Sequence, residues 1–195
     1  LALRSERLLG LAREQARLGE LEHRASHDDR TDLLRPDVFE RRIEELVSAA
    51  QRHHFDFALI LVDLDDFGRV NKTWDHTTGD LVITKVGETI RRNLRQEDVA
   101  GRLGGDEFGI LLPYTGKIDT AHAVRRLRDE IKRLTASLQA RAPGIEVSAS
   151  LGFETSDGTD IDTAIVLRQH AEQALREAKR LGGGCAVYYR SLAAG

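Results

Sequence analysis

Several of the hydrophobic positions in the first 25 residues are regularly spaced. Leu11, Leu18 and Ala25 stand seven residues apart, and Leu8 belongs to a second row, among many Arg and Glu side chains. A seven-residue spacing places apolar side chains on one narrow stripe of a helix, as in a coiled-coil seam. We therefore expect residues 1–27 to form a coiled-coil signalling helix that dimerises in parallel. The alternative is a lone amphipathic helix that packs on its own domain.

A polar break at residues 27–32, which we interpret as a linker, is followed by alternating helical and strand-like patterns. Apolar positions three or four residues apart predict helices, and short apolar runs bounded by turn residues predict strands. The predicted helices are 36–53, 78–94, 118–140 and 161–181. The predicted strands are 57–64, 99–103, 108–112, 145–153 and 185–189. This order predicts an α/β fold with a mixed, antiparallel-containing, five-stranded sheet flanked by helices, in one domain over residues 28–195.

Composition narrows the class of protein. The chain has 195 residues, 41% of them hydrophobic, which is enough for one sizeable core. Its formal net charge of −3, with charges of both signs interspersed, argues against a nucleic-acid-binding surface. The single cysteine, Cys185, excludes an internal disulfide, and we expect it to be a small buried hydrophobe.

The sequence also carries signals about location. No apolar run approaches the roughly 18 residues of a membrane-spanning helix, and no signal peptide is visible. We expect a cytoplasmic protein without direct membrane contact in this fragment. The chain begins at Leu1, without a methionine and within a helical pattern, so we also expect it to be the output domain of a longer sensor protein.

The predicted hairpin in the middle of the chain carries two acids at its glycine-rich turn. Gly104 and Gly105 are expected to supply the positive φ of a tight turn, and Asp106 and Glu107 follow them. Adjacent carboxylates beside a backbone without side chains suit a divalent cation and a phosphate. An ordinary polar surface turn is the alternative.

Acidic residues also end the apolar strand at residues 57–64. Asp63, Asp65 and Asp66 lie where this strand ends. A carboxylate at the end of a central strand, facing the carboxylate pair of a neighbouring hairpin, is an arrangement that holds two divalent metals against a nucleoside triphosphate. The alternative is that Asp63 caps the following helix.

Asn71 and Asp80 form a candidate pair for a guanine base. Guanine presents donors at N1 and N2 and acceptors at O6 and N7, so a site that selects it needs an amide donor and a carboxylate acceptor. Asn71 and Asp80 supply these two groups. Alternatively, Asp80 favours a helix N-terminus and Asn71 favours a turn.

The pentapeptide Gly-Gly-Asp-Glu-Phe at residues 104–108 resembles the signature of the GGDEF family, the diguanylate cyclases, which condense two GTP into cyclic di-GMP. The resemblance covers about residues 28–190. It includes His76 at the family's spacing after Asn71, and the segment 171–179, which is similar to the family's Ala-Asp-x-Ala-Leu-Tyr-x-Ala-Lys. The resemblance implies the palm-like architecture shared with adenylyl cyclases and polymerases.

The same resemblance implies a role for each site residue. Asp63 and Asp106 would hold two Mg²⁺ or Mn²⁺ ions together with the backbone carbonyl of Leu64, and Glu107 would assist the metals or take the 3′-hydroxyl proton. The residues implied to bind guanosine are Asn71, His76 and Asp80. Those implied to lie beside the α-phosphate and ribose are Gly104 and Gly105. Those implied to hold the β- and γ-phosphates are the amides of Phe67 and Gly68 and the side chain of Lys179.

The chain departs from the family pattern at several positions. Gly68 stands in place of the usual Lys, and Gly183 stands in place of an Arg, so two phosphate-binding cations are absent. Lys72 and Arg69 are candidates to replace them. The other departures are Lys72 for Asp, Asp75 for Gly, and Arg30-Thr31-Asp32-Leu33 for Leu-Thr-Gly-Leu.

The resemblance also implies a dimer and a feedback site. One domain binds one GTP, so the reaction needs two domains face to face, and the N-terminal seam would raise their effective concentration. Arg95 and Asp98 resemble the family's Arg-x-x-Asp product-inhibition motif, and Arg102 would add a second cation. The alternative for Arg95 and Asp98 is an exposed ion pair at a helix end. The rival functions are a catalytically silent receptor for GTP or cyclic di-GMP, and a cyclase that makes a different cyclic nucleotide.

Overall fold

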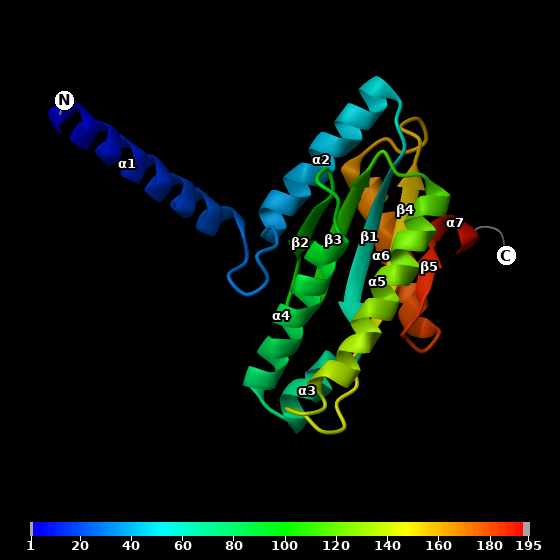
Figure 1. The fold of residues 1–195 in the computed structure, drawn as a ribbon. Coiled ribbons are helices and arrows are strands. Elements are labelled where there is room, and N and C mark those ends of the chain that lie inside the picture. Colours follow the sequence, from blue (N-terminus) through cyan, green and yellow to red (C-terminus); the bar gives the residue numbers. More distant parts are fainter. Residues whose placement is uncertain (1, 193–195) are drawn as a thin grey trace.

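The computed structural model describes residues 2–192, with side chains described from residue 10 to residue 192. A five-stranded sheet in the order β2-β3-β1-β4-β5 lies between two layers of helices (Figure 1). The strands are β1 (Phe57–Leu64), β2 (Val99–Arg102), β3 (Glu107–Pro113), β4 (Ala149–Ser156) and β5 (Ala186–Tyr188). The helices are α1 (Ala2–Ser26), α2 (Pro36–His53), α3 (Phe67–Thr73), α4 (His76–Asn93), α5 (Lys117–Leu138), α6 (Ala164–Arg180) and α7 (Tyr189–Leu192). No helix within residues 2–192 is long and apolar enough to cross a membrane.

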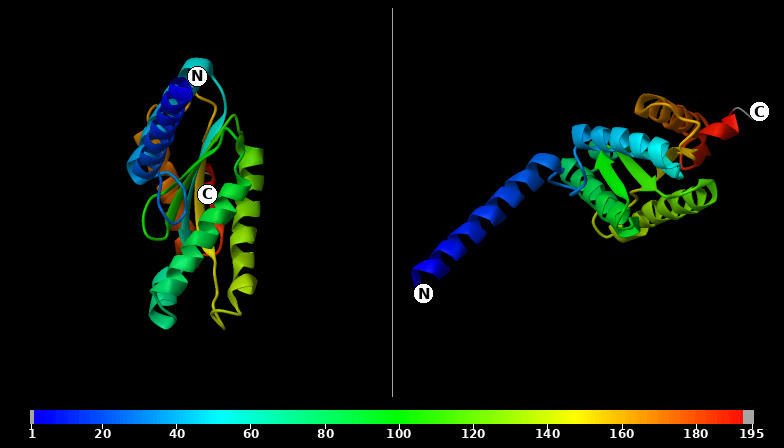
Figure 2. Two further views of the ribbon diagram at one scale, coloured as in Figure 1. Left: turned by 60° about the vertical axis from the view of Figure 1, so that its left-hand side comes forward. Right: turned by 90° about the horizontal axis from the view of Figure 1, so that it is seen from above.

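The sheet is mixed, as predicted. Neighbouring strands are antiparallel except for β4 and β5, which run parallel. Helices α2 and α6 cover one face, and α4 and α5 cover the other (Figure 2). Every residue of the central strand β1 is buried. Its side chains alternate between the two layers, so Ile60 and Val62 pack in the α4/α5 core while Leu59 and Leu61 pack in the α2/α6 core.

Two predicted elements are confirmed at their expected bounds, most others differ by one to three residues at an end, and β4 begins four residues late. Helix α2 begins at Pro36, where a proline costs no hydrogen bond, and β1 covers the predicted apolar run. Strand β4 begins at Ala149 rather than at residue 145, because the preceding residues bond elsewhere: the Val147 amide donates to the Thr135 hydroxyl at 2.9 Å. The short helices α3 and α7 were not predicted, since each spans too few residues for a helical period to emerge.

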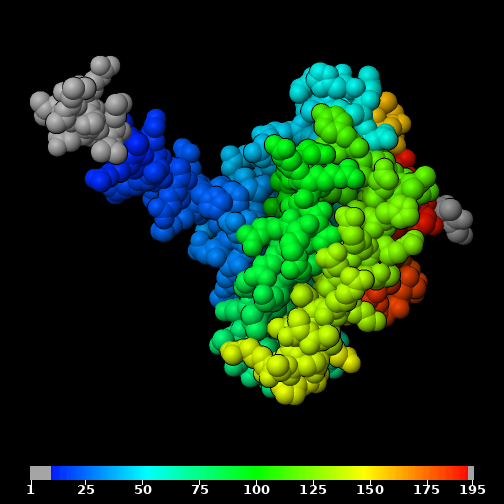
Figure 3. Space-filling view, in the orientation of Figure 1, coloured from blue at the N-terminus to red at the C-terminus, as the bar shows by residue number. Residues whose placement is uncertain are grey.

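Helix α1 projects away from the sheet domain (Figure 3). Its seam residues Leu11 and Leu18 are 57% and 51% exposed, and Leu21 is 54% exposed. The alternative that this helix packs its apolar stripe on its own domain is therefore wrong for these residues. The segment between α1 and α2 folds back and pairs with the sheet edge, where the Leu34 amide donates to Ala100 O at 3.0 Å.

Candidate active site

Three carboxylates meet where β1 ends beside the β2–β3 hairpin. Strand register pairs Asp63 with Glu107, and the Leu64 amide donates to Asp106 O at 3.1 Å, which fixes the hairpin tip against the end of β1. Asp63 is buried, and Lys179 from α6 places its Nζ 2.6 Å from Asp63 Oδ2. The register that aligns two buried strands thus gathers the acids that the sequence predicted would face one another.

The electrostatics of this cluster favour an incoming cation. Burial raises the pKa of Asp63 above its ordinary value, although Lys179 opposes this effect, and the charges of Asp106 and Asp65 raise it further. Desolvation also raises the pKa of Glu107, with added repulsion from Asp63 and Asp106. Several carboxylates therefore share one ammonium group, and a second positive charge would relieve their repulsion.

The donor set fits a hard divalent cation held partly by substrate. Carboxylate and carbonyl oxygens are the ligands of Mg²⁺, which binds through one or two carboxylates and substrate phosphates rather than in an all-protein cage. Across the described part of the chain, no group of three or more His, Cys, Asp or Glu forms a ready metal cage. Asp63, Asp106 and the Leu64 carbonyl would thus supply part of a coordination shell, which phosphates and water would complete.

The hairpin tip differs from the expected tight turn. Neither Gly104 nor Gly105 has a positive φ, so that prediction is wrong. The tip spans residues 103–106, and Arg102 supports it by donating from Nε to Gly104 O at 3.2 Å and from Nη2 to Gly105 O at 2.8 Å. A Cβ at Gly104 would lie 3.2 Å from Glu107 Oε2, whereas a Cβ at Gly105 would meet open space. The glycines therefore matter for the bare backbone they present, not for left-handed conformation.

A cleft of about 570 Å³, here called the phosphate cleft, joins Asp63 and Asp106 to the predicted phosphate-binding residues. Its lining residues are Asp63, Leu64, Asp65, Asp66, Phe67, Gly68, Asp106, Lys179, Gly182 and Gly183. Neither of the suggested replacement cations, Arg69 and Lys72, lines it. Lys179 is thus the only basic side chain in this lining.

Asp65 has an anchoring role that the sequence did not reveal. Its carboxylate accepts hydrogen bonds from the hydroxyls of Ser148 and Ser150 at 2.7 and 2.6 Å and from the Gly184 amide at 2.8 Å. It therefore holds the glycine loop that follows α6 against the start of β4. Gly183 has φ +77°, and a Cβ there would lie 2.8 Å from Asp65 Oδ1, so this loop has no room for the Arg of the family pattern.

The predicted guanine residues lie on α3 and α4. The Asn71 side chain packs directly on Gly79, where any side chain would overlap its Oδ1 atom. Asp80 follows in α4 and is ion-paired with Arg30. The helix N-cap is Asp75, whose carboxylate accepts from the Thr78 amide at 2.6 Å, so Asp80 does not cap this helix.

His76 opens α4 and is exposed. Together with Asn71 and Asp80 it lies outside the lining of the phosphate cleft. Nothing in the described contacts tests its predicted part in guanosine binding, which stays a prediction.

The predicted product site is a turn between α4 and β2. Asp98 Oδ2 accepts from the Arg95 amide at 2.8 Å, and in residues 10–192 no ion pair joins the two side chains. Asp98 Oδ1 is buried without a partner among the described groups, and burial raises the pKa of this carboxyl despite the nearby charges of Arg95 and Arg126. Arg102 instead pairs with Asp28 at 3.2 Å. Arg126, on α5, is a cation near Asp98 that sequence reasoning missed.

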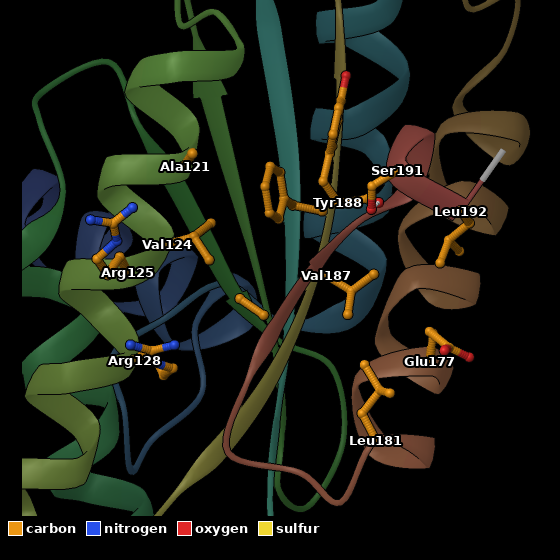
Figure 4. A pocket seen from close by; sticks show the side chains of 12 residues that line it. Ala121, Val124, Arg125, Arg128, Glu177, Leu181, Val187, Tyr188, Ser191 and Leu192 are labelled. Atoms are coloured by element: carbon orange, nitrogen blue, oxygen red, sulfur yellow. Dashed lines mark hydrogen bonds between the residues drawn. The ribbon is translucent and has the colours of Figure 1, made fainter. Parts of the chain in front are cut away.

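A further cavity of about 450 Å³ lies between α5, β5, α6 and α7 (Figure 4). Its polar side chains include Arg125 and Arg128 on α5 and Glu177 on α6. None of the predicted site residues lines it. The phosphate cleft beside β1 is therefore the candidate active site.

Comparisons with known proteins identify the family of the chain. A family model described as "Diguanylate cyclase, GGDEF domain" matches residues 25–185. The chain belongs to the GGDEF family. The resemblance drawn from residues 104–108 is thereby confirmed.

Relatives and solved structures give the extent of this similarity. The GGDEF chain is 34% identical over 172 residues to MucR of Pseudomonas aeruginosa, a bifunctional diguanylate cyclase/cyclic di-GMP phosphodiesterase, covering 88% of this chain and 24% of MucR. It is 34% identical over 178 residues to the diguanylate cyclase TpbB of the same species, covering 89% and 39%. Its fold matches the coiled coil and GGDEF domain of DgcB from Caulobacter crescentus, solved with cyclic di-GMP, at a TM-score of 0.85 and 24% identity, covering 96% and 97%. The chain spans less than half the length of these two curated relatives.

Proposed function

We propose that this GGDEF domain is a diguanylate cyclase that condenses two GTP into cyclic di-GMP and releases pyrophosphate. The observation that carries the proposal is that Asp63 and Asp106 line a cleft together with Lys179, while strand register places Glu107 beside Asp63. Relatives named diguanylate cyclases, aligned over most of this chain, support the same reaction. The intact guanine pair, Asn71 and Asp80, favours GTP over other nucleotides.

Each residue of the cluster has a task in this reaction. Asp63 and Asp106 would bind two Mg²⁺ or Mn²⁺ ions with the Leu64 carbonyl, and the ions would polarise the α-phosphate and favour loss of the 3′-hydroxyl proton. Glu107, whose pKa is raised, would accept that proton. Lys179 would leave Asp63 for the β- and γ-phosphates and neutralise the departing pyrophosphate.

The reaction requires two copies of the domain. Each cleft holds one GTP, so the 3′-hydroxyl of one nucleotide must meet the α-phosphate of the other across an antiparallel pair of domains. We propose that α1 brings the copies together as a parallel coiled coil through Leu11 and Leu18, whose exposure leaves them free to pair. The DgcB structure, which comprises a coiled coil and a GGDEF domain, supports this arrangement.

The product would inhibit the enzyme at the turn after α4. We propose that Arg95 binds a product phosphate or the guanine Hoogsteen edge, and that Asp98 accepts from guanine N1 and N2. The buried, unpartnered Oδ1 of Asp98, seen among the described groups, supports a ligand there, because such an acceptor is costly without a donor. Arg126 replaces Arg102 in this proposal, since Arg102 is engaged by Asp28 and the hairpin tip.

A second candidate function is a receptor that binds GTP or cyclic di-GMP without turnover. The observation that favours it is the loss of two phosphate-binding cations, at Gly68 and Gly183. Incubation with GTP and Mg²⁺, followed by chromatography of the products, separates the two candidates. We expect cyclic di-GMP and pyrophosphate to accumulate. Nucleotide binding without product would instead identify a receptor, and a different cyclic product would overturn the guanine assignment.

A further inference from the structure

Arg30 belongs to the linker between α1 and α2, yet its guanidinium reaches α4. Its Nη1 atom lies 2.5 Å from Asp80 Oδ1, and both side chains are about half exposed. Arg30 stands where the family pattern has a leucine, so this ion pair is a feature of this chain rather than of the signature. It touches one of the two residues to which guanine recognition is assigned.

The linker around Arg30 is anchored to α4, which distinguishes this ion pair from a mobile surface pair. Thr31 is buried, and it packs so closely on Gly87 that a Cβ there would lie 2.7 Å from the Thr31 Cβ. Asp32 is ion-paired with Arg91 of α4 at 2.9 Å. Because the neighbouring backbone is fixed, Arg30 loses little further freedom when it pairs, whereas an unanchored exposed pair contributes almost nothing.

The chemistry of guanine explains what this pair can do. A carboxylate that accepts from guanine N1 and N2 lies next to the O6 acceptor, since O6 is bonded to the carbon adjacent to N1. A guanidinium has five N–H donors, so Arg30 can keep one on Asp80 and direct another to O6. Adenine would present an amino group to the guanidinium and a ring acceptor to the carboxylate, which mismatches both groups.

We propose that Arg30 is a base-specificity residue that donates to guanine O6 while it remains paired with Asp80. This inference rests on the proposed function, in which the domain takes GTP at Asn71 and Asp80. It assigns to the linker a direct part in substrate selection, in addition to its role in joining α1 to the domain.

The test compares GTP with two analogues that each alter one group of the base. Inosine triphosphate lacks the N2 amino group but keeps O6, whereas 6-thio-GTP keeps N1 and N2 but replaces O6 with sulfur, a weak acceptor. Arg30→Leu is expected to raise KM about ten- to hundredfold for GTP and inosine triphosphate, with kcat little changed, and to raise it far less for 6-thio-GTP. Arg30→Lys, which retains a charge with fewer donors, is expected to lie between the parent and Arg30→Leu.

Arg42→Leu is the matched control, because it removes an exposed arginine–glutamate pair on α2, away from Asp80 and from the contacts that anchor the linker. It is expected to leave KM unchanged for all three nucleotides. An unchanged KM for GTP in Arg30→Leu would overturn the proposal. A lower KM would also overturn it, since Arg30 would then compete with the base for Asp80.

Calorimetry with a non-hydrolysable GTP analogue separates this inference from the proposed function. If the parent makes no cyclic di-GMP but Arg30→Leu still weakens analogue binding, the cyclase proposal fails and the specificity role stands. If the parent is an active cyclase and binding is equal in both proteins, the specificity role alone fails.

Discussion

Two glycines stand in place of the missing phosphate cations, but they differ in what a side chain would meet. Gly68, at the start of α3, has open space for a side chain, since no atom lies within 4 Å of where a Cβ would stand, and its φ is not positive. Gly183 has φ +77° and lies against Asp65. One position can therefore accept the side chain of the family pattern, and the other cannot without moving the glycine loop.

Gly68→Lys is expected to lower KM for GTP about threefold to tenfold, because it adds a cation at the cleft that holds the triphosphate. Gly183→Arg is expected to destabilise the domain by about 1–3 kcal/mol, because a side chain at positive φ is strained and would displace the Asp65 contact. Steady-state kinetics and thermal unfolding measure these effects. If Gly183→Arg were as stable as the parent and Gly68→Lys had no effect on KM, the account of both glycines would be wrong.

Asp106 is expected to act on metal binding rather than on folding. Asp106→Asn should abolish turnover and leave the free energy of unfolding within about 1 kcal/mol of the parent, because the change preserves shape and relieves repulsion on Asp63 and Glu107. Metal titrations should show loss of Mg²⁺-dependent thermal stabilisation in the presence of nucleotide. Asp119→Asn, at an exposed position on α5, is the control. Near-normal turnover in Asp106→Asn would count against the metal assignment.

An ion pair between Asp28 and Arg102 joins the linker to the hairpin tip. Arg102 bonds both hairpin carbonyls and reaches Asp28, whose carboxylate also accepts from the Thr31 amide and hydroxyl at 3.0 and 2.8 Å. Burial opposes ionisation of Asp28, but the Thr31 hydrogen bonds and the charge of Arg102 outweigh burial and lower its pKa. The linker at the base of α1 is thereby coupled to the tip that carries Asp106.

The lowered pKa makes this contact sensitive to acid. A carboxyl whose pKa is lower in the folded state stabilises folding above its unfolded pKa of about 3.9, and the contribution is lost as the pH falls through the folded value. Asp28→Asn is therefore expected to cost about 1–3 kcal/mol at neutral pH and progressively less below about pH 4. Urea unfolding from pH 2 to pH 7 measures both. Asp37→Asn, an exposed acid on α2, controls for loss of charge, and a pH-independent effect of Asp28→Asn would contradict the linkage.

The turn after α4 is expected to carry product inhibition. Arg95→Ala should relieve inhibition by cyclic di-GMP without lowering the initial rate, because Arg95 is exposed and lies outside the lining of the phosphate cleft. Arg92→Ala, which removes an exposed arginine from the end of α4, is the matched control. Calorimetry that finds equal cyclic di-GMP affinity in the parent and in Arg95→Ala would remove this site.

The elements that could be predicted are those that a pattern within one short stretch of sequence determines. The apolar run of β1 and the glycine-rich hairpin predicted neighbouring strands with acids at their ends, and the register of Asp63 with Glu107 confirms that they meet. The contacts of Asp65 with Ser148 and of Arg30 with Asp80 join segments far apart in the chain, and no local period encodes them. The positive φ expected for Gly104 and Gly105 is wrong for a different reason, since the tip is not a tight two-residue turn and Arg102 bonds both of its glycine carbonyls.

A single domain offers a site for only one of the two GTP molecules that the proposed reaction needs. The phosphate cleft has a single cation, Lys179, and room for one triphosphate, so the second nucleotide must arrive on another copy. Helix α1 extends from the domain with exposed leucines, and the linker ties its base to the sheet edge through Leu34. The orientation of α1 in a dimer would therefore set how two clefts face each other.

This arrangement makes activity depend on protein concentration through α1. Replacing Leu11 and Leu18 with glutamate should weaken the dimer, because charges in a coiled-coil seam are desolvated and repel their counterparts. Specific activity should then rise more steeply with protein concentration than in the parent, by about tenfold across the range where the parent is already dimeric. The control is Arg13→Gln with Arg17→Gln, which changes the charge of α1 by the same amount away from the seam. Sedimentation measures dimerisation, and activity assays over a dilution series measure its effect on the rate. A glutamate variant that stays dimeric and equally active at high dilution would show that α1 has another role.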